Sequence, residues 1–195
     1  GGPSQCAVGI QDAGNPSSGV NGTGHRIRDT IARYCWFRGF LIHVNGFTMD
    51  DCLATKIGGS TRAAWLNSHA FAYEFLGAGG VVRHCVAHDY FVPGEGEPVG
   101  FATNDYAMPA VFQDNIATNP VIRGKSIGFF FGSDNSRVVA ERNVAINQEY
   151  GYWWKVPNPI PEPGTPGALR NNIAHNCTTK YLYEPTITED LGGNV

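Results

Sequence analysis

A chain of 195 residues is the size of one domain, and its formal net charge of −3 lacks the basic excess that nucleic-acid-binding proteins use to neutralise phosphates. No run approaches the roughly eighteen apolar residues of a membrane-spanning helix. Glycine and proline are abundant and no helical periodicity is sustained, so the sequence predicts short strands joined by turns. We expect residues 1–195 to form a single domain that is a fragment of, or a segment within, a larger protein.

The cysteines and sequons bear on the compartment and on metal binding. No CxxC pair occurs among Cys6, Cys35, Cys52, Cys85 and Cys177, so a zinc site has no support. Two tripeptides, Asn21-Gly22-Thr23 and Asn176-Cys177-Thr178, match the N-glycosylation pattern. They are weak evidence for a secreted chain, and an extracellular or cell-surface location is the expectation.

A four-residue pattern recurs along the chain: a polar residue, then Asn, Cys or Thr, then an aliphatic residue, then alanine. Its copies, in chain order, are Asp29-Thr30-Ile31-Ala32, Asp51-Cys52-Leu53-Ala54, His84-Cys85-Val86-Ala87, Asp114-Asn115-Ile116-Ala117, Arg142-Asn143-Val144-Ala145 and Asn171-Asn172-Ile173-Ala174. A second marker, a small residue before an aromatic one, runs in phase with it at Gly39-Phe40, Ala70-Phe71, Gly100-Phe101, Gly128-Phe129 and Gly151-Tyr152. Two markers in phase indicate a structural repeat.

The repeat predicts an all-β fold, a right-handed parallel β-helix of about six stacked coils with long loops. One coil cannot bury its own apolar face, so stacking supplies the core. We expect Asn115, Asn143 and Asn172 to stack as a ladder of hydrogen-bonded amides, continued by Cys52 and Cys85 as small buried residues. A leucine-rich or helical solenoid would need a leucine spacing or helical period that the repeats lack. A β-sandwich is the other alternative.

Two segments rich in proline interrupt the repeat, and we expect them to leave it as loops because proline is excluded from interior strands. They are Val92–Pro98 and Pro157–Pro166. Loops on one side of a solenoid commonly wall a binding groove.

The asparagine-ladder coils, from about Arg26 to Tyr183, resemble the pectate-lyase-like β-helix superfamily, which includes polysaccharide lyases, polygalacturonases, epimerases and phage depolymerases. The stretch from Ser68 to Glu74 looks like a glycine-histidine-x-phenylalanine-x-x-glutamate segment of cell-surface hyaluronidase-like β-helix proteins, although Ser68 replaces the glycine and Phe75 stands where an acidic residue is common. Asn143-Val144-Ala145 followed by Gly151-Tyr152-Trp153-Trp154 is similar to coils of the same group. The resemblance implies an activity on polysaccharides.

The Asp50-Asp51 pair also resembles the paired aspartates of polygalacturonases, and Arg123-Gly124-Lys125 resembles their later Arg-x-Lys. No glycine-histidine-glycine segment lies between the two. The internal repeat already explains Asp51, so coincidence is the better account.

One column of residues could carry chemistry, the position just before the ladder: Asp29, Asp51, His84, Asp114, Arg142 and Asn171. If these side chains face outward, neighbours lie roughly 5 Å apart, a separation that suits the two carboxylates of retaining glycoside hydrolysis. Such carboxylates could equally hold a calcium ion, or form a solvated face of cross-strand pairs. We place the candidate catalytic site at Asp51, His84 and Asp114, with His69, Glu74 and Glu95 converging from loops and Arg142 binding substrate.

The second candidate is an aromatic cluster that would bind substrate: Tyr152, Trp153, Trp154 and Lys155. Alternate residues of a strand face opposite sides, so Trp153 and Trp154 cannot both be buried. An exposed tryptophan suits stacking on a sugar ring, and a covering proline-rich loop is the other interpretation.

Two functions follow as hypotheses. The first is a polysaccharide-degrading β-helix, hydrolase or lyase, acting on an acidic or complex glycan, with no cofactor required and a calcium ion as an optional ligand. The second is a non-catalytic structural or adhesive segment, such as a stalk, coat or fibre unit. No capping helix is evident at either end of the repeat, so open coils would favour end-to-end association with another copy or with parent domains.

Overall fold

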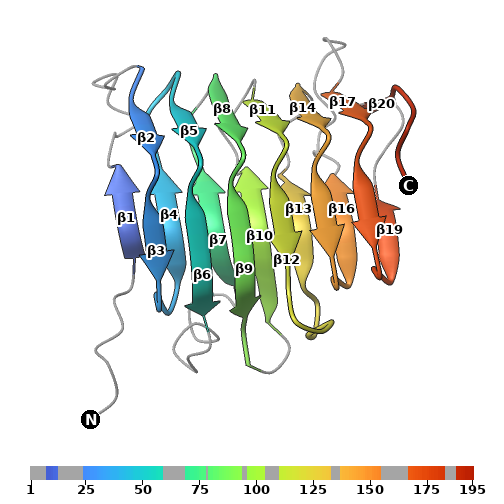
Figure 1. The fold of residues 1–195 in the computed structure, drawn as a ribbon, viewed down its shortest axis with the longest axis horizontal. Coiled ribbons are helices and arrows are strands. Elements are labelled where there is room, and N and C mark those ends of the chain that lie inside the picture. The colour runs from blue at the N-terminus through green and yellow to red at the C-terminus, as the bar shows by residue number, and fades with distance from the viewer. Residues whose placement is uncertain are drawn as a thin grey trace.

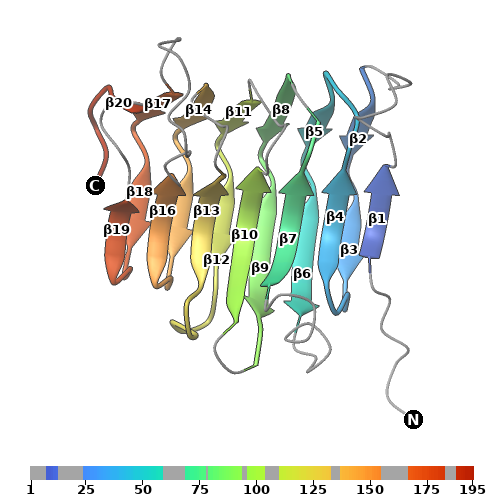
Figure 2. The same ribbon diagram turned by 180° about the vertical axis from the view of Figure 1, so that it is seen from behind.

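The protein is a right-handed parallel β-helix, as the repeat predicts. The computed structural model describes residues 8–12, 24–58, 69–77, 79–93, 96–103, 110–132, 137–154, 167–182 and 188–195. Over these ranges the secondary structure consists of strands that pair in parallel, without a helix. Figures 1 and 2 show the chain passing along one face of the molecule and back along the opposite face as it advances from coil to coil. Right-handed connections of this kind are the rule between parallel strands.

Each complete coil contributes one strand to each of three sheets. The first sheet contains, in spatial order, β1 (Val8–Asp12), β4 (Arg38–Ile42), β7 (His69–Phe75), β10 (Glu97–Thr103), β13 (Ile127–Phe131), β16 (Tyr150–Trp154) and β19 (Thr179–Leu182). The second contains β2 (Arg26–Arg28), β5 (Thr48–Asp50), β8 (Gly80–Arg83), β11 (Ala110–Gln113), β14 (Val138–Glu141), β17 (Gly167–Arg170) and β20 (Thr188–Asp190). The third contains β3 (Ile31–Arg33), β6 (Leu53–Gly58), β9 (Val86–Phe91), β12 (Ile116–Thr118), β15 (Val144–Ile146) and β18 (Ile173–His175).

The repeated alanine occupies one position of the third sheet and faces the core. All six alanines of the pattern pair in register, and each is at most 3% exposed. They pack against the glycine of the second marker in the first sheet. A Cβ on Gly128, for example, would lie 2.9 Å from the Cβ of Ala145 and 2.6 Å from the backbone oxygen of Gly151. Only very small residues fit where the two sheets approach, which explains both repeated residue types.

The aromatic residues of the second marker form a stacked column in the core. Its members are Phe40, Tyr73, Phe101, Phe129, Tyr152 and Tyr181, with ring centroids 4.5 to 5.1 Å apart between neighbours. The marker predicted for the second coil is wrong by two residues. Tyr73, not Phe71, pairs with Phe40, whereas Phe71 pairs with Arg38. Ala72-Tyr73 has the same small-aromatic form as Ala70-Phe71, so composition alone did not separate the two.

The asparagine ladder is confirmed. The side-chain amide of Asn115 donates to Oδ1 of Asn143 at 2.9 Å, and that of Asn143 donates to Oδ1 of Asn172 at 3.1 Å. Asn194, which the repeat did not include, continues the ladder by accepting from Asn172 at 3.0 Å. Each Oδ1 also accepts a backbone N–H, and each amide also donates to a backbone carbonyl of the preceding coil.

The ladder column continues toward the N-terminus with two thiols. Cys52 and Cys85 are buried there as free cysteines, in agreement with a structural role.

Candidate functional site

The column predicted from the sequence is a row of bends between the second and third sheets. Its six residues, Asp29, Asp51, His84, Asp114, Arg142 and Asn171, all have left-handed backbone with φ between 50° and 56°. Asp and Asn tolerate this conformation best, which accounts for most of the residue types. The next residue of each coil turns inward to the ladder, so the bend residues face outward and are exposed or half-buried. We call this row the bend column.

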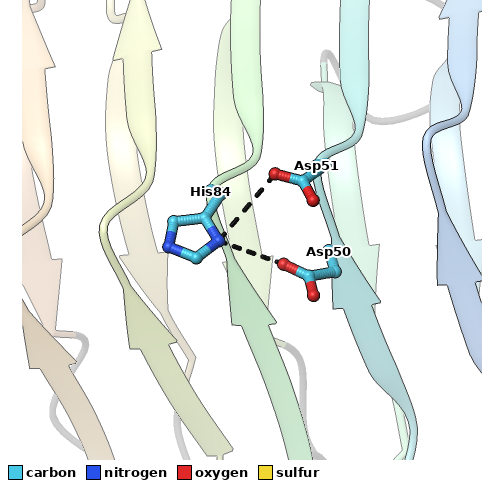
Figure 3. Close-up of side chains that lie close together, drawn as sticks. All are labelled: Asp50, Asp51 and His84. Atoms are coloured by element: carbon cyan, nitrogen blue, oxygen red, sulfur yellow. Dashed lines mark hydrogen bonds and ion pairs between the residues drawn. The ribbon is translucent and has the colours of Figure 1, made fainter.

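A histidine lies between carboxylates at the centre of the bend column. Nδ1 of His84 lies 3.1 Å from Oδ1 of Asp50 and 3.9 Å from Oδ1 of Asp51, as Figure 3 shows. Nε2 of the same ring lies 4.0 Å from Oδ2 of Asp114. Because an ionised carboxylate only accepts hydrogen bonds, the Nδ1–H of His84 donates to Asp50. The imidazole thus links three neighbouring coils.

Arginines hold the carboxylates of this region in their ionised form. Nη2 of Arg83 lies 3.0 Å from Asp50, and its hydrogen bond, with that of His84, lowers the pKa of Asp50 against the opposing effect of burial. Arg142 bonds Asp114 through two nitrogens at 2.8 and 2.9 Å, which lowers the pKa of Asp114. A general acid needs a raised pKa, so neither carboxylate suits that role at neutral pH.

The order of residues in the bend column sets the distance between its carboxylates, and that distance determines which type of glycoside hydrolysis they could catalyse. Asp51 and Asp114 are separated by the coil that carries His84, so two strand spacings place them roughly 9 to 10 Å apart. Retaining hydrolysis needs about 5 to 5.5 Å, and inverting hydrolysis about 6.5 to 9.5 Å. The predicted retaining arrangement is therefore not formed by this pair. Asp29 and Asp51 are in adjacent coils, but Arg28 lies within 3.7 Å of both carboxylates.

Asp50, Asp51 and His84 also form a cluster whose potential ligand atoms lie within 4.8 Å of one another. Calcium prefers six to eight oxygen ligands, and this cluster offers two carboxylates and a nitrogen. Arg26 and Arg83 lie 3.7 and 3.0 Å from the Asp50 carboxylate and already compensate its charge. A cation would have to compete with these arginines.

The structure separates Glu74 from the bend column. Glu74 belongs to β7 in the first sheet, is 3% exposed, and forms an ion pair with Arg38. His69 begins the same strand, in register with Glu97, but its side chain is outside the described part of the structure. The predicted convergence of Glu74 on Asp51 is not present, because Glu74 lies in the first sheet whereas Asp51 lies in the bend between the second and third sheets.

The aromatic cluster is divided between the core and the surface. Tyr152 is fully buried in the aromatic column and Trp154 is 2% exposed in the core. These two rings are corrected from candidate substrate-binding residues to core residues. Trp153 faces outward and is half-buried, so the predicted alternation of the two tryptophans is confirmed. Lys155, Glu95 and the segment Pro157–Pro166, predicted to be a loop, lie outside the described residues. The prediction that Val92–Pro98 leaves the strands as a loop is wrong at its end, because Glu97 and Pro98 belong to β10 and pair with β7.

Trp153 is part of a larger outward-facing surface that the sequence did not reveal. Its ring lies 5.5 Å from that of Phe130 in an edge-to-face arrangement and 5.2 Å from that of Tyr150. We call these three half-buried rings the aromatic platform. They pack on Val99 and Ile127 of the same sheet, apart from the main core. Phe130 was hidden in the sequence because it lies within a continuous apolar run, Ile127–Phe131.

No family model, curated protein or solved structure matches this chain. Within the described ranges, no helix is long and apolar enough to cross a membrane.

Proposed function

We propose that the protein is a carbohydrate-active β-helix that binds a complex glycan on the outer face of the first sheet, at the aromatic platform. One observation carries the proposal: Trp153, Phe130 and Tyr150 form a group of half-buried rings on an outward-facing strand surface. Aromatic rings offer a large apolar face with little conformational freedom to lose. Such a face matches the C–H face of a sugar ring, while the sugar hydroxyls stay in water.

Two further points support a glycan as the ligand. The ladder coils resemble the pectate-lyase-like superfamily, whose members act on polysaccharides. Phe130 is in register with Trp153 on the neighbouring strand, so the two rings follow one another along the solenoid axis. A polymer lying along the solenoid axis would contact one of these rings at each of the two coils. An extracellular or cell-surface location belongs to this proposal.

Binding is better supported than cleavage, because hydrogen bonds from arginine lower the pKa of Asp114 in the bend column and of the adjacent Asp50, so neither carboxylate suits a general acid. The proposal is tested by measuring calorimetrically the binding of neutral and uronic-acid polysaccharides to the wild type and to Trp153→Ala. We expect the variant to weaken binding of at least one polymer on the order of tenfold. The matched control is Tyr34→Ala, which removes an aromatic ring that is 39% exposed elsewhere. Unchanged affinity of Trp153→Ala, or binding of no polymer by the wild type, would contradict the proposal.

Cleavage at the bend column is the second candidate, favoured by the position of His84 between Asp51 and Asp114. The carboxylate separation of roughly 9 to 10 Å is near the inverting range, and His84 could serve a lyase as base. Incubation with the same polymers distinguishes the reactions, since a hydrolase releases reducing ends and a lyase also gives unsaturated products that absorb in the ultraviolet. Activity abolished by Asp51→Asn or His84→Ala would support this candidate. Absence of both products would leave the non-catalytic, adhesive role.

A further inference from the structure

The aliphatic position of the repeat faces outward on the third sheet and forms one continuous row. Its members pair in register from coil to coil: Ile31, Leu53, Val86, Ile116, Val144 and Ile173. Ile31, Ile116 and Ile173 are 63%, 37% and 42% exposed, and the other three are half-buried. Figure 1 labels β3, β6, β9 and β12, which carry part of the row, side by side on one face of the molecule. We call this row the aliphatic stripe.

The stripe is unusual for a strand that already buries its other face. Such strands alternate between apolar residues inside and polar residues outside. Here the inward position is alanine in all six strands, and the outward position is Ile, Leu or Val in all six. Single exposed aliphatic residues are common on proteins, but a contiguous row across six strands, about 24 Å long, is typical of an interaction surface.

The bend column beside the stripe shows which partner fits. It is acidic at its N-terminal end, with Asp29 and Asp51, whereas Arg142 lies toward its C-terminal end. A two-fold axis along the strands, between β9 and β12, would reverse the order of coils in a second copy. Asp51 would then face Arg142 of that copy, and His84 would face its Asp114. No two like charges of the column would meet.

We infer that the aliphatic stripe is an interface between two copies of this chain, packed face to face with their solenoid axes antiparallel. In this arrangement each aliphatic residue meets an aliphatic residue of the other copy, such as Val86 with Ile116. The hydrogen bonds of Arg142 to Asp114 and Glu141 use three of its five N–H donors, so two can serve a carboxylate across the interface.

The alternative two-fold axis, parallel to the solenoid axis, fits less well. It would lay the aliphatic stripe on the row that contains Arg33, His88 and His175, and so bury charged and polar groups against aliphatic ones, whereas the antiparallel arrangement lays that polar row on its own copy. The interface of the antiparallel dimer is small, about 24 Å along the solenoid axis by about 17 Å along the strands. An area at the lower end of interface sizes predicts a reversible dimer. The dimer covers the bend column and leaves the aromatic platform free, so it is compatible with glycan binding and not with cleavage at Asp51.

The test is sedimentation equilibrium over a concentration series from about 1 µM to about 1 mM. We expect the wild type to dimerise reversibly, and Ile116→Glu to raise the dimer dissociation constant on the order of a hundredfold, because two carboxylates would enter an apolar contact. The matched control is Ile122→Glu, since Ile122 is 38% exposed but lies outside the third sheet. It should associate like the wild type.

Two double variants test the antiparallel register. Both place charges at the same two positions, and they differ only in the sign of the charge at residue 31. Ile31→Lys with Ile173→Glu would set opposite charges face to face across the two-fold axis and should keep the dissociation constant within about threefold. Ile31→Glu with Ile173→Glu would set like charges there and should raise it at least about tenfold. The proposal is overturned by a wild type that stays monomeric throughout, by Ile116→Glu associating normally, or by equal loss of association in both double variants.

Discussion

His84 and Asp50 are joined by a hydrogen bond of 3.1 Å across two coils, although they are 34 residues apart in the sequence. Asp50 ends β5 with a nearly buried carboxylate, and His84 is the exposed bend residue of the next coil. Arg83 also donates to Asp50, so two residues of one coil are hydrogen-bonded to one carboxylate of the preceding coil. This contact makes Asp50, which the repeat pattern did not single out, the central acceptor of the network.

The first prediction concerns stability in acid. Arg83 and His84 hold the pKa of Asp50 below its usual value of 3.8, so the folded state gains stability from this group above that pH and loses it as the pH falls through the lowered value. Asp50→Asn should therefore lower the free energy of unfolding by about 1 to 2 kcal/mol at pH 7, and the difference from the wild type should shrink below about pH 4. Urea unfolding at several pH values measures it. Asp29→Asn, at a largely exposed carboxylate, is the control and should change stability by less than about 0.5 kcal/mol.

The second prediction concerns the asparagine ladder. Asn143→Ala removes the amide that connects Asn115 to Asn172. It leaves the Phe112 carbonyl without its donor, and it leaves the backbone N–H and the side-chain amide of Asn115 without the oxygen to which they donate. The expected loss is about 2 to 4 kcal/mol, measured by urea unfolding. Asn194→Ala, at the end of the ladder, should cost less because Asn194 has a ladder neighbour on one side and is partly solvated. An equal loss in both variants would contradict a stacked ladder.

The third prediction separates two adjacent aromatic residues. Tyr152→Ala should destabilise the protein by about 3 to 5 kcal/mol, because it leaves a cavity in the stacked column between Phe129 and Tyr181. Trp153→Ala removes an outward ring and should cost clearly less. Thermal unfolding followed by circular dichroism compares them. A larger loss for Trp153→Ala would mean that the platform supports the fold, and would disqualify that variant as a probe of glycan binding.

The fourth prediction concerns calcium. The arginines beside Asp50 already compensate its charge, so we expect 1 mM calcium to stabilise the fold by less than about 0.5 kcal/mol, which corresponds to a dissociation constant above about 1 mM. Arg83→Met removes the closest competing cation and should strengthen calcium binding relative to the wild type. Thermal unfolding with and without calcium measures both. A clear stabilisation of the wild type that is lost in Asp51→Asn would instead establish a calcium site at this cluster.

The fold could be predicted from the sequence because its determinants recur from coil to coil. A residue that must be small, such as Ala117, recurs in all six copies of the pattern, and one that hydrogen-bonds its own equivalent, such as Asn143, recurs in the last three. The alternation of Trp153 and Trp154 follows from strand geometry alone. Because equivalent contacts form between each pair of neighbouring coils, the residues that make them recur along the sequence, and a single sequence was sufficient to predict the architecture.

The tertiary structure alone decided which side chains meet across different sheets and which way each bend turns. The sequence could not show that Glu74 lies in the first sheet, away from the bend that carries Asp51, or that Tyr73 rather than Phe71 enters the aromatic column. It also could not show that the aliphatic position of the repeat faces solvent. The physical reason is the left-handed bend residue before each ladder position: it redirects the chain, and thereby determines which of the following residues enter the core and which remain on the surface.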